Sequence, residues 1–323
     1  MTAKQEMAYL AYAGGWSAVR RMPESVAYNT FDAIADRLWS RRGDGVKQLE
    51  KNLARIRPDA TYAQLRKLSR QSMRSYFRYW CDAFRMPDWS DEQVVDRFEC
   101  ENADYLIDAL KLNKGVIVAL PHMGNWDHAG AWATLDVGPL TAIAERLEPE
   151  KLFDKFVEYR ESIGLRIHAL GTPGVVDTLA SELRNDNRIV ALLADRDLTA
   201  RGIGVTFFGL ATRMPAGPSN LALRTGAPLF PATLWYDGKK AHAKIHPQVK
   251  VPAKAPSGDD ASGKPGYNKA VNSMTQQIAD AFEEGIREHP ADWHMMQKLW
   301  LEDLDPERLA ATEAKRQAAA AGG

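Results

Sequence analysis

From about residue 100 onwards, short apolar runs alternate along the chain with longer segments in which apolar residues recur at helical spacing. The apolar runs predict five strands: Val116–Leu120, Leu140–Ala144, Ile167–Leu170, Ile189–Ala194 and Leu229–Trp235. The segments between them predict four helices: Trp126–Leu135, Pro149–Ile163, Val175–Asn185 and Ala216–Thr225. This alternation predicts an α/β fold with a central, largely parallel (mixed) sheet flanked by helices and with ligands at the carboxyl ends of the strands.

Helical spacing also runs through the N-terminal part of the chain, from Ser25 to about Trp89. Prolines at positions 23, 58 and 87 divide this part into successive helices. The expected buried faces carry Phe31, Ile34 and Leu38, then Val46, Leu49, Leu53 and Ile56, then Leu65, Leu68, Met73, Phe77 and Trp80. We therefore predict a helical lead-in whose apolar stripes pack in the core.

The C-terminal part adds fewer elements. We expect a strand or hairpin arm over His242–Val251, a polar loop over Pro252–Gly266 and a long helix over Tyr267–Glu288. The segment His289–Trp300 either packs on the protein or touches a membrane, and the alanine-rich tail from Glu307 is expected to be a frayed helix. The predicted organisation is a single domain over residues 1–323, with a helical lead-in (1–95), an α/β core (96–300) and a tail (301–323).

The most apolar N-terminal stretch, Met7–Val19, is interrupted by Gly14 and Gly15 and is shorter than the roughly 20 residues of a membrane-spanning helix. It lacks the pattern of a signal peptide, so we expect a cytosolic chain. The stretch suits a short amphipathic helix on an anionic membrane, formed by Tyr9, Leu10, Tyr12, Trp16 and Val19 and followed by Arg20 and Arg21. The alternative is a helix packed on the body of the protein.

Composition narrows the range of partners. The chain has 42 Lys and Arg against 42 Asp and Glu, so its formal net charge is zero, which argues against nucleic acid as a partner. An anionic ligand must then be met by local groups of arginine. The two cysteines, Cys81 and Cys100, fit no zinc or redox spacing and indicate a reducing compartment.

The strand Val116–Leu120 ends at Pro121 and is followed at once by His122, with an acid, Asp127, further along. Asn125 is a good N-cap, so a helix that starts there would place Asp127 in its first turn, where the helix dipole favours the carboxylate. We predict that Asp127 accepts a hydrogen bond from one ring nitrogen of His122 while the other nitrogen faces a substrate. Such a histidine is typical of a general base.

A second acidic sequence follows the strand Ile189–Ala194. In an extended stretch, Asp195 and Asp197 point to one side and Arg196 to the other. Either acid could support His122 or orient an acceptor hydroxyl. The alternative is a solvated loop with a local Asp–Arg pair.

Candidate anion-binding groups gather in the same half of the sequence. The segments Phe207–Gly209 and Thr212–Pro218 are expected to form a turn that opens the next helix with free backbone N–H groups, which suit a phosphate or an oxyanion. Arginine is the better side chain for phosphate because its planar fork bonds two oxygens. The arginines in this half are Arg146, Arg160, Arg166, Arg196, Arg201 and Arg213.

Two rival functions remain open at this point. A metal-dependent hydrolase would use His122, Asp127, Asp195 and Asp197 as ligands, but the sequence has no second well-placed histidine for such a site. A non-catalytic lipid-binding protein predicts that His122→Ala leaves turnover unchanged.

These motifs resemble those of the lysophospholipid acyltransferase superfamily and, more narrowly, of the lipid A lauroyl/myristoyl acyltransferase family. The matching motifs are Pro121–Asp127, Phe156–Arg160 with Gly164, Ala194–Asp197, Phe207–Gly209, Pro215–Gly217 and His289–Trp293. The resemblance covers nearly the whole chain. Gram-negative lipid A enzymes usually carry glutamate at the position of Asp127 and a membrane-spanning N-terminal helix. With these departures, the chain looks most like the actinobacterial phosphatidylinositol mannoside acyltransferases.

The resemblance implies an O-acyltransferase that needs no cofactor and no metal and takes acyl-CoA as co-substrate. His122 would act as general base on an acceptor hydroxyl, which attacks the thioester, while Asp127 holds the histidine tautomer. A further helper acid to His122 could be Asp195, Asp197, Glu145 or Glu148. Backbone donors near Gly124 or Pro215–Gly217, or an arginine, would hold the oxyanion. The acyl chain would enter an apolar tunnel between the sheet and the helices.

The implied acceptor is a glycolipid, namely a mannose of phosphatidylinositol mannoside, with a lipid A-type acceptor as the alternative. The enzyme would work peripherally on the cytoplasmic face of the cell membrane, in contact with its anionic surface. The predicted catalytic residues are His122, Asp127, Asp195 and Asp197. The predicted substrate-binding residues are Gly124, Asn125, Arg146, Arg160, Arg196 and Arg213.

Overall fold

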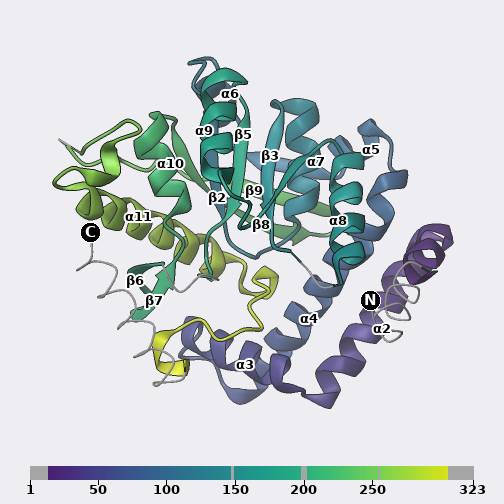
Figure 1. Cartoon of the computed structure of the whole chain (residues 1–323). Helices are drawn as coiled ribbons and strands as arrows, with labels where there is room; N and C mark the ends of the chain where they lie inside the picture. Colours follow the sequence, from purple (N-terminus) through teal and green to yellow (C-terminus); the bar gives the residue numbers. More distant parts are fainter. Residues whose placement is uncertain (1–13, 147–148, 198–201, 254, 305–323) are drawn as a thin grey trace.

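A mixed seven-stranded sheet forms the centre of the computed structural model, which describes residues 14–146, 149–197, 202–253 and 255–304 (Figure 1). The strands lie in the order β1-β9-β8-β2-β5-β3-β4. Neighbouring strands are parallel except in the β8–β9 hairpin, so the predicted largely parallel, mixed sheet is confirmed. The strand bounds are β1 Phe98–Glu101, β2 Val116–Leu120, β3 Leu140–Ala144, β4 Arg166–Ala169, β5 Ile189–Leu193, β8 Leu229–Asp237 and β9 Lys240–Ile245.

Helices cover both faces of this sheet (Figure 1). Helices α9, α10 and α11 pack on one face, and α6 and α7 on the other. Along β2, Ile117 and Ala119 belong to the first core, whereas Val116, Val118 and Leu120 belong to the second. Because both faces are covered, β2 is apolar at every position. The helix bounds are α5 Asp91–Asp96, α6 Asp104–Leu110, α7 Trp126–Asp136, α8 Glu150–Ser162, α9 Val175–Asn185, α10 Gly217–Thr225 and α11 Tyr267–Glu288.

The helical lead-in is also confirmed. It contains α2 (Glu24–Arg41), α3 (Asp44–Ile56) and α4 (Tyr62–Arg85), and α4 packs against the other two. Helix α4 begins at a capping box, in which the side chains of Thr61 and Gln64 each bond the backbone N–H of the other. This long helix then carries its C-terminal half to the edge of the sheet where the site lies.

The stripe predicted for α2 is wrong in part. Phe31 is buried as expected, but Ile34 and Leu38 are 41% and 38% exposed. The buried face of α2 consists of Ala27, Phe31 and Ala35, and the two alanines let α2 lie close to α4. The packed face of α2 is therefore the one with small residues, which allow close approach to α4, and not the one with the larger apolar side chains.

The described part of the N-terminal stretch packs on the protein. Residues 14–21 are helical, and Gly14 and Gly15 belong to this helix. Trp16 and Val19 are buried, and Nε1 of Trp16 donates to the carbonyl of Phe84 at 3.0 Å. For these residues the packed alternative holds and the membrane contact is wrong. The other residues of the predicted amphipathic face, Tyr9, Leu10 and Tyr12, lie outside the described residues.

A small antiparallel hairpin replaces the predicted turn between residues 207 and 218. Strands β6 (Ile203–Phe207) and β7 (Leu210–Met214) pair through the two-residue turn Phe208-Gly209. Both turn residues have positive φ, 50° and 75°, as a type I′ hairpin turn requires. The strands β1 and β9 also differ from the expectation: β1 is a polar edge strand with no apolar run, and β9 ends at Ile245 instead of Val251.

The segment after α11 returns to the site and packs there. Trp293 and Trp300 are both fully buried, so the predicted packing is right and the predicted membrane contact of this segment is wrong. The tail from Glu307 lies outside the described residues. Within the described part of the chain, no helix combines the length and the apolar character that crossing a membrane requires.

Candidate active site

His122 lies at the carboxyl end of β2, and Asp195 lies at the same end of the neighbouring strand β5. The two strands are parallel and in register, with Leu120 opposite Leu193. This pairing brings together side chains that are 73 residues apart in the sequence. Ligands of open α/β folds bind at this edge of the sheet.

Asp195 fixes the orientation of the His122 ring. Its Oδ1 lies 2.6 Å from Nδ1 of His122, and its Oδ2 accepts from the backbone N–H of His122 at 3.0 Å and from Nε1 of Trp293 at 3.1 Å. Burial opposes ionisation of Asp195, but the charge of His122 and these hydrogen bonds outweigh it and hold the pKa of Asp195 below its usual value. A carboxylate at Nδ1 keeps the proton on that nitrogen, so Nε2 can accept one.

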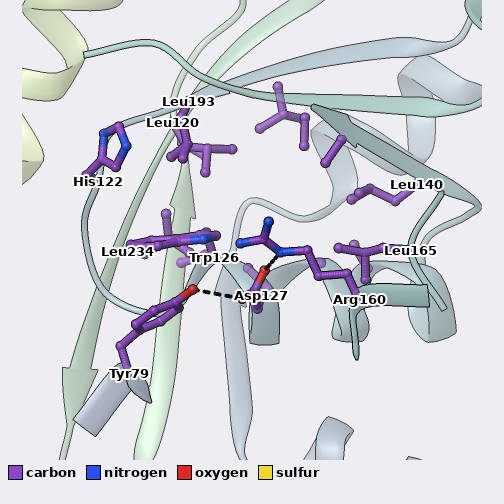
Figure 2. Close-up of a pocket in the computed structure, with 18 of the residues that line it drawn as sticks. Tyr79, Leu120, His122, Trp126, Asp127, Leu140, Arg160, Leu165, Leu193 and Leu234 are labelled. Atoms are coloured by element: carbon purple, nitrogen blue, oxygen red, sulfur yellow. Dashed lines mark hydrogen bonds and ion pairs between the residues drawn. The ribbon is translucent and has the colours of Figure 1, made fainter. Parts of the chain in front are cut away.

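The predicted hydrogen bond between Asp127 and His122 is wrong, because Asp127 has other partners. Its Oδ1 accepts from Nε of Arg160 at 2.8 Å, and its Oδ2 accepts from the hydroxyl of Tyr79 at 2.9 Å (Figure 2). Asp127 does lie in the first turn of α7, as predicted, and it is 1% exposed. In this position the carboxylate of Asp127 faces α4, which carries Tyr79, and α8, which carries Arg160. Each carboxylate oxygen therefore already accepts a hydrogen bond.

The Asp127–Arg160 ion pair is buried but also reaches the cavity beside His122. Burial opposes the charge of Arg160, but Asp127 outweighs this effect and raises the pKa of the guanidinium. Figure 2 shows the far end of the guanidinium turned into the cavity while Nε bonds Asp127. Arg160 can therefore hold Asp127 and still offer N–H donors to a substrate.

Gly124 and Asn125 shape the loop between β2 and α7 and do not face the cavity. Asn125 caps α7 as predicted, and its Nδ2 donates to the buried Asp82 at 3.3 Å. The N–H of Gly124 donates to the carbonyl of Asp292 at 2.9 Å, so it is not available to an oxyanion. Gly124 has φ 57°, and a Cβ there would lie 2.7 Å from the backbone of Leu234, which only glycine avoids. These contacts give both residues a structural role in the loop, and substrate binding by them stays a prediction.

The remaining candidates are separated by the fold. Arg196 lines the cavity, whereas Asp197 accepts from the backbone N–H of Gly202 at 2.7 Å and lies outside the described lining. Arg146 follows β3 with a side chain that is 57% exposed and pairs with the first residue of α8. Arg213 lies in the small hairpin, outside the described lining. Of the predicted arginines that the structure describes, Arg160 and Arg196 line the cavity, and Arg201 lies outside the described residues.

A cavity of about 380 Å³ opens beside His122 between the sheet and helices α7 and α8. Most of its lining is apolar, and Figure 2 shows leucines from four strands and from the loop after α8 around it: Leu120, Leu140, Leu165, Leu193 and Leu234. The predicted apolar space between sheet and helices is therefore present. The start of α10 at Pro215–Gly217, which was expected to supply oxyanion donors, is not part of the described lining.

The predicted metal ligands do not converge. Asp127 is held by Arg160 and Tyr79, away from the His122–Asp195 pair. Among the residues that the structure describes, no three His, Cys, Asp or Glu side chains are grouped so as to hold a metal ion. The arrangement does not fit the hydrolase interpretation.

Three side chains of the site were missed by the sequence analysis: Tyr79, Trp293 and His294. Tyr79 and Trp293 bond the two acids, and His294 lines the cavity. The available signal was that buried Tyr and Trp usually find a hydrogen-bond partner. Spacing along the chain could not say which partner, because Trp293 lies 98 residues from Asp195.

Proteins of similar sequence identify the family. A family model described as bacterial lipid A biosynthesis acyltransferase matches residues 2–302. A phosphatidylinositol mannoside acyltransferase of Mycolicibacterium smegmatis is 43% identical over 305 residues, which cover 93% of this chain and 94% of the relative. The protein of the same name from Mycobacterium tuberculosis is 41% identical over 309 residues, which cover 94% of this chain and 92% of the relative. The chain therefore belongs to the bacterial lipid A biosynthesis acyltransferase family and is an acyltransferase.

Proposed function

We propose that this acyltransferase moves a long-chain acyl group from acyl-CoA to a mannose hydroxyl of a phosphatidylinositol mannoside. One observation carries the proposal: a histidine held through Nδ1 by a buried acid stands beside an apolar cavity. The two mycobacterial relatives, whose names give phosphatidylinositol mannoside as the molecule acylated, support this acceptor.

In this proposal His122 acts as a neutral general base. Its Nε2 takes the proton of the acceptor hydroxyl while the hydroxyl oxygen attacks the thioester carbonyl carbon. The carbon–sulfur bond then breaks, the ester is released, and the proton passes from His122 to the leaving thiolate. Asp195 stabilises the imidazolium that exists between the two proton transfers.

We assign the developing oxyanion to Arg160. Its guanidinium end faces the cavity, and its position is fixed because Asp127 holds Nε (Figure 2). A donor that is already in place costs no reorganisation during the reaction, and losing one such donor typically costs about 3 to 4 kcal/mol. Arg196, the other arginine of the lining, would meet a phosphate of the donor or of the inositol lipid.

The acyl chain would lie in the apolar part of the cavity. Burying each methylene group contributes about 0.8 kcal/mol, so a long chain gains most of its affinity there. The sugar of the acceptor carries hydroxyls that favour water, and it would remain near His122. The thioester then lies between the acyl chain and the sugar, next to His122.

Replacing His122 with alanine should lower acyl transfer by about 10² to 10⁴-fold, the usual contribution of a general base. The measurement is thiol release from palmitoyl-CoA with and without mannosylated phosphatidylinositol. His168→Ala is the matched control, because His168 pairs with Glu182 away from the cavity. Thiol release at the wild-type rate in His122→Ala would refute the role of His122 as general base. Stimulation by a lipid A-type acceptor alone would refute the proposed acceptor.

We also propose that the enzyme works peripherally on the cytoplasmic face of the cell membrane. Its proposed acceptor is a membrane lipid. Helix α2 supports this location, because it exposes an apolar stripe: Val26 and Ile34 line one shallow hollow and are 48% and 41% exposed, and Leu38, one turn beyond Ile34, is 38% exposed. Arg37 lies beside this stripe. An exposed apolar stripe next to basic side chains suits the headgroup region of an anionic membrane.

Wild-type protein should therefore co-sediment with vesicles that contain phosphatidylinositol in low salt, and less in high salt. The triple variant Val26→Ser, Ile34→Ser, Leu38→Ser should sediment much less. Leu135→Ser, which changes another exposed apolar side chain at 44% exposure, is the control. Equal sedimentation of the triple variant and wild type would remove α2 from the membrane contact.

A further inference from the structure

His294 lies beside the base, and one of its ring nitrogens is unused. The residue is 5% exposed and lines the cavity that also holds His122. Its Nε2 lies 2.9 Å from Oγ of Ser75, whereas its Nδ1 is buried and has no hydrogen-bond partner in the described part of the chain. Buried polar atoms in folded proteins are nearly always bonded, so an unbonded nitrogen on a residue of the cavity lining is a candidate contact for a ligand.

The neighbours of His294 decide what kind of ligand this nitrogen can take. Ser75 has a single hydroxyl proton, which it donates to Oδ1 of Asp292 at 2.5 Å. Its oxygen can then only accept from His294, so Nε2 carries the proton and Nδ1 carries a lone pair. Burial and the nearby charge of His122 lower the pKa of His294 to about 3, which keeps the ring neutral. Nδ1 is therefore a hydrogen-bond acceptor, suited to a hydroxyl or an amide N–H.

His122 and His294 are tied together through their backbones, and both rings lie near Trp126. The backbone N–H of His294 donates to the carbonyl of His122 at 2.8 Å, and Met123 and Trp293 form an antiparallel bridge next to it. The ring of Trp126 lies 5.9 Å from that of His122 and 6.3 Å from that of His294. One wall of the cavity thus presents two imidazoles on a single paired stretch of backbone.

We propose that Nδ1 of His294 accepts a hydrogen bond from a second hydroxyl of the sugar acceptor, close to the hydroxyl that His122 deprotonates. The inference rests on the proposed function, because it takes the acceptor to be a sugar. A sugar ring carries neighbouring hydroxyls at a fixed spacing, which two rigidly linked imidazoles can match. Ser75 and Asp292 are positioning residues that fix the tautomer of His294.

The test compares two activities of the same enzyme: transfer of palmitate from palmitoyl-CoA to mannosylated phosphatidylinositol, and hydrolysis of palmitoyl-CoA without acceptor. His294→Phe keeps an aromatic ring but removes the acceptor nitrogen. We expect the ratio of transfer to hydrolysis to fall about tenfold, the scale of one hydrogen bond, with a higher KM for the acceptor. His294→Asn, whose side-chain oxygen can take the place of Nδ1, should recover part of this loss. His168→Phe is the matched control, since His168 lies outside the described lining.

Ser75 offers an independent test, because it touches His294 but does not belong to the described lining of the cavity. Ser75→Ala removes the hydroxyl that fixes the tautomer of His294 and should lower the ratio of transfer to hydrolysis. Ser75→Thr keeps the hydroxyl and should restore this ratio.

An unchanged ratio in His294→Phe would overturn the assignment. A higher KM for palmitoyl-CoA in hydrolysis would also overturn it, because the partner of Nδ1 would then be an amide of the donor. A wild-type enzyme that hydrolyses palmitoyl-CoA but transfers nothing to the mannosylated lipid would refute the proposed function, and this assignment with it. The first two results leave the proposed function intact, so the failures can be told apart.

Discussion

Asp195→Asn should lower the rate of acyl transfer by about 10⁴-fold without unfolding the protein, the loss known for the equivalent change in serine proteases. The amide oxygen can still accept from the backbone of His122 and from Trp293, which bond one carboxylate oxygen in the wild type. The amide nitrogen would then face Nδ1 of His122 as a donor. His122 would have to carry its proton on Nε2, and it could no longer act as a base.

The measurement is kcat from thiol release at saturating acceptor, together with thermal unfolding to verify the fold. Asp197→Asn is the control, since Asp197 bonds the backbone of Gly202 and should lose far less than tenfold. A variant Asp195→Asn that folds normally and keeps a rate within tenfold of the wild type would show that another group orients His122.

Asp127→Ala should act chiefly on stability. The change leaves the guanidinium of Arg160 buried without its carboxylate, and it leaves the hydroxyl of Tyr79 without an acceptor. Breaking a buried ion pair by removing one partner typically costs about 3 to 5 kcal/mol. For a domain of this size we expect the melting temperature to fall by roughly 10 °C. Transfer should fall as well, because a loosened Arg160 would no longer hold the oxyanion that we assign to it.

The double variant Asp127→Ala, Arg160→Met tests this explanation, because it removes the charge that the single change leaves alone. It should recover a large part of the lost melting temperature but none of the lost transfer. Calorimetry and thiol release on both variants give the comparison. If Asp127→Ala melts like the wild type and yet loses transfer 10³-fold, Asp127 acts on the chemistry directly, as the sequence spacing predicted.

The fold could be predicted from the sequence where both faces of a strand are buried. The strands Val116–Leu120 and Leu140–Ala144 have the predicted bounds, and so does helix Val175–Asn185, because apolar runs and helical stripes end where burial ends. The edge strand Phe98–Glu101 was missed, because an edge strand with polar residues has no such run. In α2 the packed face was mispredicted, since close approach of two helices favoured alanine over leucine.

The candidate site was predictable only in part, for a related reason. The sequence located His122 correctly at a strand end and put Asp127 correctly in the first turn of a helix. Which acid touches the histidine depends on the strand that lies next to β2, and the local sequence contains no information about that neighbour. Because β5 lies next to β2, Asp195 is the acid that contacts His122. The packing of α4 and α8 places Arg160 against Asp127.

The bond from Trp293 to Asp195 also has a consequence for the time at which the enzyme becomes competent during synthesis. The ribosome adds Trp293 98 positions after Asp195, and His294 follows it. Until then the carbonyl of His122 lacks the N–H of His294, and Asp195 lacks one of its donors. A nascent chain that has already formed β2 and β5 therefore carries a His122–Asp195 pair that lacks these two hydrogen bonds.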